Sequence, residues 1–123
     1  MRKLLIVDDE DGVRELVRMT LDAGGYEIIE ASEGGQALEL ARRHRPALVL
    51  LDVMLPDRSG LEVCREMKND PALASTSVVM LTARAQTSDV GDAEDAGADG
   101  YFTKPFSPIA LTRKVEKILG PVA

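Results

Sequence analysis

The sequence predicts an α/β domain built on a doubly wound parallel sheet of five strands, with helices on both faces. Short apolar segments alternate with amphipathic helical patterns along the chain, which is typical of parallel strands joined by right-handed crossovers. Several apolar segments lack polar alternation, as strands buried on both faces do. The 123 residues suit one domain, because no linker, repeat or low-complexity tract divides them.

The predicted strands are short, and the last has the weakest pattern. The first, third and fourth are continuous apolar runs rich in Leu, Val and Ile. The second and fifth are each supported by two residues only. In order, the five predicted strands are residues 4–7, 28–29, 48–51, 78–81 and 101–102.

Helical patterns fill the intervals between these strands. Apolar side chains recur at helical spacing over residues 13–21, and the glycine pair at 24–25 ends that first helix. Ser32 is expected to cap a second helix that runs toward Arg45. A third helix carries Cys64 on its inward side, and Ser107 with Pro108 begins the last helix, which Gly120 ends.

Residues 86–100 predict a fourth helix that is the least stable element. Its inward face has only Val90, Ala93 and Ala96, and Gly91 lies within it. Elsewhere, large side chains are expected to fill the core, and the methionines placed there are Met19, Met67 and Met80.

Composition excludes several classes of function. The formal net charge is -6 and no basic patch stands out, which disfavours direct binding to nucleic acid. The single cysteine, Cys64, excludes an internal disulfide and suits a reducing compartment. No apolar run approaches the roughly 20 residues that span a bilayer, and the first residues do not read as a signal peptide. We therefore expect a cytoplasmic protein that does not bind membranes.

Polar residues follow four of the predicted strands, at the edge where parallel α/β sheets bind ligands. Taken singly, each has an ordinary structural explanation, such as a helix cap, a turn hydroxyl or a surface cation. Convergence of all of them on one edge favours a functional site. The set comprises Asp8, Asp9, Asp52, Thr82, Lys104 and Pro105.

The chemistry of this set resembles that of phosphoryl transfer. Carboxylates on neighbouring strand ends repel one another, and Mg2+ would relieve that repulsion because it prefers carboxylate oxygens. Lys104 and Thr82 offer a charge and a hydroxyl for phosphoryl oxygens. No GxxxxGK[ST] loop is present, so nucleotide hydrolysis is disfavoured. Asp52 can serve as a carboxylate nucleophile that forms an acyl phosphate.

Four motifs give the chain its resemblance to a known family. They are "VDDE" at 7–10, "LLDVMLPDRSG" at 50–60, "MLTA" at 80–83 and "GADGYFTKPF" at 97–106. In this order and spacing the chain resembles the receiver domain of two-component response regulators. The resemblance implies a flavodoxin-like sheet of order 2-1-3-4-5 and a single receiver domain over residues 1–123, without an output domain. It also implies that a histidine kinase or histidine phosphotransfer protein phosphorylates Asp52.

The resemblance further implies a role for each site residue. Asp9 and Asp52 would ligate Mg2+ together with the backbone carbonyl of Met54, and Asp8 would act through a bound water. Lys104 would contact the phosphoryl group, and its peptide bond to Pro105 would be cis. The receiver would not be an enzyme with a separate substrate, although it would assist its own phosphorylation and dephosphorylation.

Thr82 and Tyr101 match the switch pair of that family. Phosphorylation would draw the Thr82 hydroxyl toward the phosphoryl group and turn the Tyr101 ring inward. This change would remodel the face formed by the fourth helix, fifth strand and fifth helix, which binds a downstream protein or a second copy. Met54 and Arg84 would lie over the phosphoryl site and set the lifetime of the acyl phosphate. Glu10 and Asp11, in contrast, are expected to be first-turn residues of the first helix.

Two other functions remain as alternatives. A phosphohydrolase of the haloacid dehalogenase kind also uses an aspartate nucleophile and Mg2+, but it needs an acid two residues after the nucleophile, where this chain has Met54. The chain also leaves no room for a substrate-selecting cap. An interaction module of receiver fold that works without phosphorylation is the second alternative.

Overall fold

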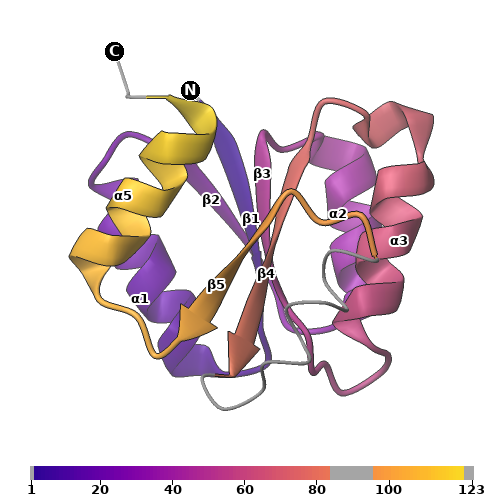
Figure 1. Ribbon diagram of the computed structural model, residues 1–123, viewed down its shortest axis with the longest axis horizontal. Helices are drawn as coiled ribbons and strands as arrows, with labels where there is room; N and C mark the ends of the chain where they lie inside the picture. Colours follow the sequence, from indigo (N-terminus) through magenta and orange to yellow (C-terminus); the bar gives the residue numbers. More distant parts are fainter. Residues whose placement is uncertain (1, 84–95, 121–123) are drawn as a thin grey trace.

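The chain folds around a five-stranded sheet in which every pairing is parallel, in the order β2-β1-β3-β4-β5 (Figure 1). The computed structural model describes residues 2–83 and 96–120. All five predicted strands are present, each longer than predicted by one to three residues, and the predicted sheet order is confirmed. The strands are β1 (Lys3–Val7), β2 (Glu27–Ala31), β3 (Leu48–Asp52), β4 (Ser77–Ala83) and β5 (Gly100–Lys104).

Helices cover both faces of the sheet, as the alternation predicts (Figure 1). Helices α1 (Asp11–Asp22) and α5 (Pro108–Leu119) lie on one face, and α2 (Gly34–His44) and α3 (Gly60–Asn69) lie on the other. The short helix η1 (Pro71–Leu73) was not predicted, because three residues carry no periodicity; the Asp70 carboxylate begins it by accepting from the N–H of Ala72. No helix in residues 2–83 and 96–120 has the length and apolarity to cross a membrane.

The core consists of one apolar layer on each side of the sheet. Alternate residues of β1 enter opposite layers, and β3 is buried along its whole length. Cys64, Met67 and Met80 are buried as expected, and so is Ala96. Met19 contradicts the expectation, because its side chain is 64% exposed: it lies two residues from the buried Val17 and so faces away from the sheet. The described end of the predicted fourth helix is not helical: residues 96–99 form a turn and a bend, and Gly100 begins β5. Residues 86–95 of that prediction, with Val90, Gly91 and Ala93, lie outside the described residues.

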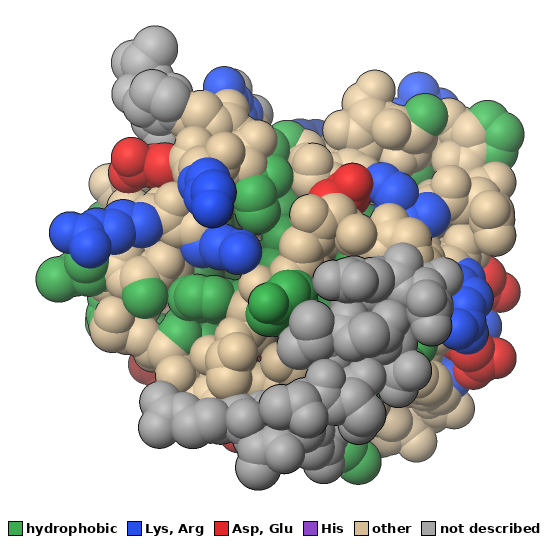
Figure 2. All heavy atoms as spheres, in the orientation of Figure 1, with side chains coloured by type: hydrophobic (Ala, Val, Ile, Leu, Met, Phe, Trp, Pro, Cys, Tyr) green, Lys and Arg blue, Asp and Glu red, His purple; other side chains and the backbone are tan. Residues whose placement is uncertain are grey.

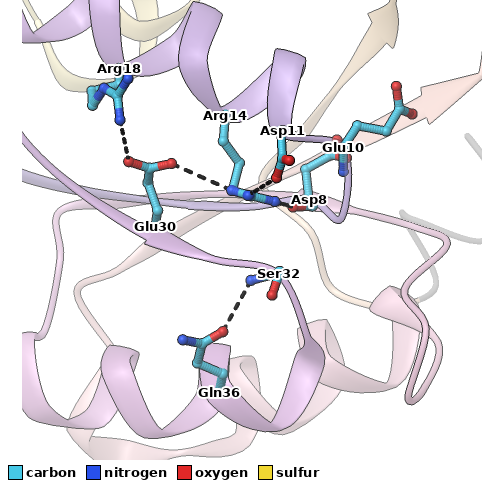
Figure 3. Close-up of polar contacts among 8 residues, drawn as sticks. All are labelled: Asp8, Glu10, Asp11, Arg14, Arg18, Glu30, Ser32 and Gln36. Atoms are coloured by element: carbon cyan, nitrogen blue, oxygen red, sulfur yellow. Dashed lines mark hydrogen bonds and ion pairs between the residues drawn. The ribbon is translucent and has the colours of Figure 1, made fainter.

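Most predicted helix ends are confirmed, and two corrections arise where tertiary contacts decide the cap. Ser107 accepts from the N–H of Ala110 at the start of α5. Ser32 does not cap α2. Its backbone N–H donates to the side chain of Gln36, and the helix begins two residues later, at Gly34 (Figure 3). Likewise α1 begins at Asp11, so Glu10 is the residue before the helix and not part of its first turn.

Candidate functional site

Four strands deliver polar side chains to the carboxyl edge of the sheet. Asp8 directly follows β1, Asp52 ends β3, Thr82 lies near the end of β4, and Lys104 ends β5. The strand register places Asp52 opposite Leu81 and Thr82 opposite Thr103, so these ends lie at one level of the sheet. The parallel pairing therefore brings together residues that are up to 96 positions apart in the sequence.

Lys104 is the centre of this edge. Its Nζ lies 3.1 Å from Asp8 Oδ2, 3.5 Å from Asp52 Oδ2 and 3.4 Å from Glu10 Oε1. Burial alone would lower the pKa of Lys104, but the hydrogen bond to Asp8 and the nearby carboxylates raise it above its ordinary value. One ammonium group is thus shared among three carboxylates. Glu10, expected to be structural, presents its carboxylate to the site.

Asp8 is fully buried and is held by backbone contacts on both sides. Its carboxylate accepts from the N–H of Glu10 at 2.9 Å, and its own N–H donates to Ala31 of β2 at 3.1 Å. The Arg14 guanidinium donates to the carbonyl of Asp8 at 2.7 Å and also pairs with Asp11 (Figure 3). Glu30 of β2 lies 3.4 Å from Arg14, which ties the turn after β1 to the neighbouring strand.

The buried carboxylates are reluctant to ionise. Burial, and after it the charge of Asp8, raises the pKa of Asp52 to about 6, although Lys104 acts in the opposite direction. Burial likewise raises the pKa of Asp8, against the hydrogen bonds from Glu10 and Lys104. The single ammonium of Lys104 therefore does not balance the negative charge at this edge.

The residues present suit a hard divalent cation. Carboxylate oxygens of Asp8, Asp9 and Glu10 all lie within 4.8 Å of one another, and oxygen ligands of this kind are those that Mg2+ prefers. The carboxylate of Asp52 joins this group indirectly, because it shares Lys104 with Asp8. The acids that the sequence nominated thus lie together, and Glu10 is an additional oxygen donor beside them.

The loop after β3 is folded back tightly against Asp52. The Met54 N–H faces Asp52 Oδ1 at 3.4 Å, and the Gly60 N–H donates to the Val53 carbonyl at 2.7 Å. A Cβ at Gly60 would lie 1.9 Å from the Asp52 carbonyl oxygen, so only glycine fits there. The Met54 side chain is 70% exposed.

Asp57 in the same loop is a residue whose part the sequence did not indicate. Its carboxylate accepts from the N–H groups of Gly34 and Gly35 at 2.8 and 2.9 Å, and so it caps α2 from 22 or 23 residues away. These hydrogen bonds lower the pKa of Asp57. Asp57 thereby anchors the loop that carries Met54. No sequence pattern predicts this contact, because Gly34 and Gly35 lie more than 20 residues before Asp57 in the chain.

The remaining predicted residues differ in where they lie. Thr82 is buried, with 1% of its surface exposed, whereas Tyr101 is 41% exposed and has the Lys114 ammonium 5.9 Å from its ring centre. The peptide bond between Lys104 and Pro105 is cis, as the resemblance implied. Arg84 lies outside the described residues.

Comparisons with known proteins agree on one family. A sequence model of the response regulator receiver domain matches residues 4–116. Over 118 residues the chain is 40% identical to the alkaline phosphatase synthesis transcriptional regulatory protein PhoP of Bacillus subtilis, covering 96% of this chain and 48% of that protein. Over 118 residues it is 39% identical to the phosphate regulon transcriptional regulatory protein PhoB of Pseudomonas aeruginosa, covering 96% and 52%. The chain therefore spans about half the length of these relatives.

Solved structures show the same similarity in three dimensions. A response regulator from Chloroflexus aurantiacus superposes with a TM-score of 0.91 at 36% identity, over 96% of this chain and 97% of that one. The receiver domain of a sensor histidine kinase from Pseudomonas aeruginosa superposes with a TM-score of 0.88 at 28% identity, over 97% and 98%. That second structure is described with a magnesium ion coordinated in the active site cleft.

Proposed function

Because this chain belongs to the response regulator receiver domains of two-component systems, we propose that it is a switch in which Asp52 accepts a phosphoryl group. The donor would be a phosphohistidine of a histidine kinase or of a histidine phosphotransfer protein. The observation that carries the proposal is the placement of Asp52, whose Oδ2 lies 3.5 Å from the Lys104 ammonium at the carboxyl edge.

The residues around Asp52 suit this transfer. With a pKa of about 6, the Asp52 carboxylate is mostly ionised at neutral pH and can act as a nucleophile. The P–N bond of the donor would break as an O–P bond forms at Asp52, and the donor imidazole would keep the electron pair and take up a proton. The Lys104 ammonium would shift from the carboxylates to an oxygen of the bound phosphoryl group, which gives that lysine its reason to lie between them.

Asp8, Asp9, Asp52 and the carbonyl of Met54 are the proposed holders of Mg2+, with Asp8 acting through a water. When bound, Mg2+ would neutralise charge on the carboxylates and on the incoming phosphoryl group. The close approach of the Asp8, Asp9 and Glu10 oxygens supports this assignment, as does the excess of negative charge there. Glu10 would assist by attracting the cation, since its carboxylate also contacts Lys104 at the carboxyl edge of the sheet.

Phosphorylation would change the surface formed by β5 and α5. We infer that the buried Thr82 hydroxyl moves toward the phosphoryl group and that the exposed Tyr101 ring turns into the space it leaves. The neighbouring surface offers a partner both apolar and basic groups: Ile109 is 66% exposed, and Lys and Arg side chains gather over α5 (Figure 2). A downstream protein or a second copy would bind this face. Met54 and Arg84 would control water access to the acyl phosphate.

Intact mass measurement after incubation with acetyl phosphate tests the proposal. We expect the wild type to gain one phosphoryl group when Mg2+ is present, and we expect little gain in EDTA. Asp52→Asn should gain none, whereas Asp57→Asn, in the same loop, should still accept a phosphoryl group. A phosphoryl adduct on Asp52→Asn, or equal labelling with and without Mg2+, would contradict the assignment.

A further inference from the structure

A second polar site lies at the amino edge of the sheet, at the opposite end of the strands from Lys104. Here the chain surrounds a hollow of about 580 Å³. Figure 2 shows the molecular surface indented along this edge, between the end of α5 and the segment that follows α3. The polar residues that line the hollow come from three separate segments and are Arg2, Lys3, His44, Arg45, Ser75 and Thr76.

The lining is basic in a protein whose net charge is -6. Arg2, Lys3 and Arg45 carry permanent positive charges, and no carboxylate is among the described residues that line the hollow. Nearby acids offset part of this charge, since the hydrogen bonds from Arg42 and Ala72 and, less strongly, the charge of Arg45 lower the pKa of Asp70. Glu27 lies 4.0 Å from Lys3 Nζ, and the Asp70 carboxylate pairs with Arg42 at 3.0 Å. The negative end of the α2 dipole accounts for basic residues within the last turn of that helix, but not for Arg2 or Lys3.

The backbone of Arg45 provides an independent observation. Arg45 closes α2 with φ 45° and ψ 61°, a left-handed conformation that glycine adopts without penalty and that a long side chain disfavours. Within residues 2–83 and 96–120, no carboxylate lies within 4.0 Å of its guanidinium, and Asp70, whose pKa its charge helps to lower, is paired with Arg42 instead. A residue kept in an unfavourable conformation points to a use for its side chain.

The hollow is also held in shape. The Thr76 hydroxyl donates to the carbonyl of the buried Pro46 at 2.7 Å, and the Ala47 N–H donates to the carbonyl of Lys3 at 2.8 Å. On the other side, the Arg2 guanidinium donates to the carbonyls of Leu119 and Gly120 at the end of α5. The backbone that carries Lys3 and Arg45 is thus fixed, and the Arg2 side chain is held at the end of α5, which reduces the ordering that a ligand must impose.

We propose that this hollow binds a small phosphate-bearing anion with two or more negative charges. Arg2, Lys3 and Arg45 would supply the countercharge, and the Ser75 hydroxyl would donate a hydrogen bond. Guanidinium groups match phosphate oxygens in geometry, and the volume lies in the range of small-molecule sites. Strands of five residues separate the two edges by roughly 16 Å, so this site is distinct from Asp52.

Calorimetric titration with tripolyphosphate tests the proposal. The buffer contains EDTA, which keeps metal-dependent phosphate contacts at the carboxyl edge out of the measurement, and its low salt limits screening. We expect saturable binding to one site with a dissociation constant below about 1 mM. Arg45→Gly should weaken binding about tenfold or more, because it removes a charge-assisted hydrogen bond. Its thermal midpoint should equal or exceed that of the wild type, so that unfolding cannot explain the loss.

Two controls and two ligand arms complete the design. Arg65→Gln removes one positive charge from the exposed surface of α3 and should bind as the wild type does, and hexaglutamate is the control ligand. ATP binding more tightly than tripolyphosphate would identify a nucleotide as the source of the phosphates, whereas equal binding, with none of adenosine, would identify an inorganic polyphosphate. The proposal is overturned if tripolyphosphate and ATP show no saturable binding, if Arg45→Gly binds like the wild type, or if hexaglutamate binds as tightly.

Discussion

The two edges of the sheet carry opposite charge and hold it in different ways. At the carboxyl edge, Asp8 and Asp52 are 0% and 6% exposed, and they lie against one lysine. At the amino edge, Arg2 and Arg45 are exposed to water around an open hollow. Buried charges interact strongly and shift one another's pKa values, whereas exposed charges are screened. The carboxyl edge is therefore equipped for chemistry at one group, and the amino edge for reversible binding of an anion.

Replacing the lysine of each edge gives the sharpest contrast. Lys104→Met would leave the fully buried Asp8 without its cation, and we expect the free energy of unfolding at pH 7.5 in EDTA to fall by about 3 kcal/mol. Lys3→Met removes a longer, exposed contact to Glu27 and should change the free energy of unfolding by less than about 0.5 kcal/mol. Urea unfolding measures both. Equal losses would contradict the difference in burial between the edges.

Removing an acid from the carboxyl edge should raise the free energy of unfolding, by somewhat less than Lys104→Met lowers it. The pKa of Asp52 is raised from 3.8 to about 6 in the folded protein, so its contribution to stability is present below pH 3.8 and is lost as the pH rises through 6. Asp52→Asn should therefore stabilise the metal-free protein at pH 7.5 by about 2 kcal/mol. The gain over the wild type should grow between pH 4 and 6 and then level off.

Denaturant unfolding at several pH values in EDTA measures this gain. The matched control is Asp22→Asn, which changes an exposed acid at the end of α1 and should leave the pH profile unchanged. A gain that is independent of pH, or a loss of stability in Asp52→Asn, would show that burial does not oppose the charge on Asp52.

The contrast between the edges also explains what the sequence could predict. The central strands were predictable because their apolar runs are continuous, and the acidic edge because Asp8, Asp9 and Glu10 are adjacent in the chain. The sequence nevertheless places Glu10 in the first turn of a helix. Its contact with Lys104 could not be predicted, because the two residues are 94 positions apart. The Asp57 cap of α2 was missed for the same reason, because Asp57 and Gly34 are 23 residues apart in the sequence.

The convergence of basic residues at the amino edge could not be predicted from the sequence. Its cations come from two short basic segments, residues 2–3 and 42–45, and its hydroxyls come from residues 75–76. The sequence shows each segment but does not show that the three segments meet. The expectation against direct binding to nucleic acid is a separate matter, which three cations around one hollow do not test. Local patterns reveal sites built from neighbours in the chain, and only the strand register reveals the others.

The smallest effect is expected for Arg45→Gly. This variant is the most demanding test of the comparison, because the substitution removes a cation and should still stabilise the protein. In Arg45→Gly, the left-handed conformation loses a penalty of about 1–2 kcal/mol, and the unfolded chain gains flexibility worth about 0.5–1 kcal/mol. We therefore expect the free energy of unfolding to rise by about 0.5 kcal/mol. Arg45→Ala removes the same charge but keeps a Cβ, so it should show no gain. A loss in Arg45→Gly would mean that the guanidinium stabilises the fold, and the case for a ligand at this residue would weaken accordingly.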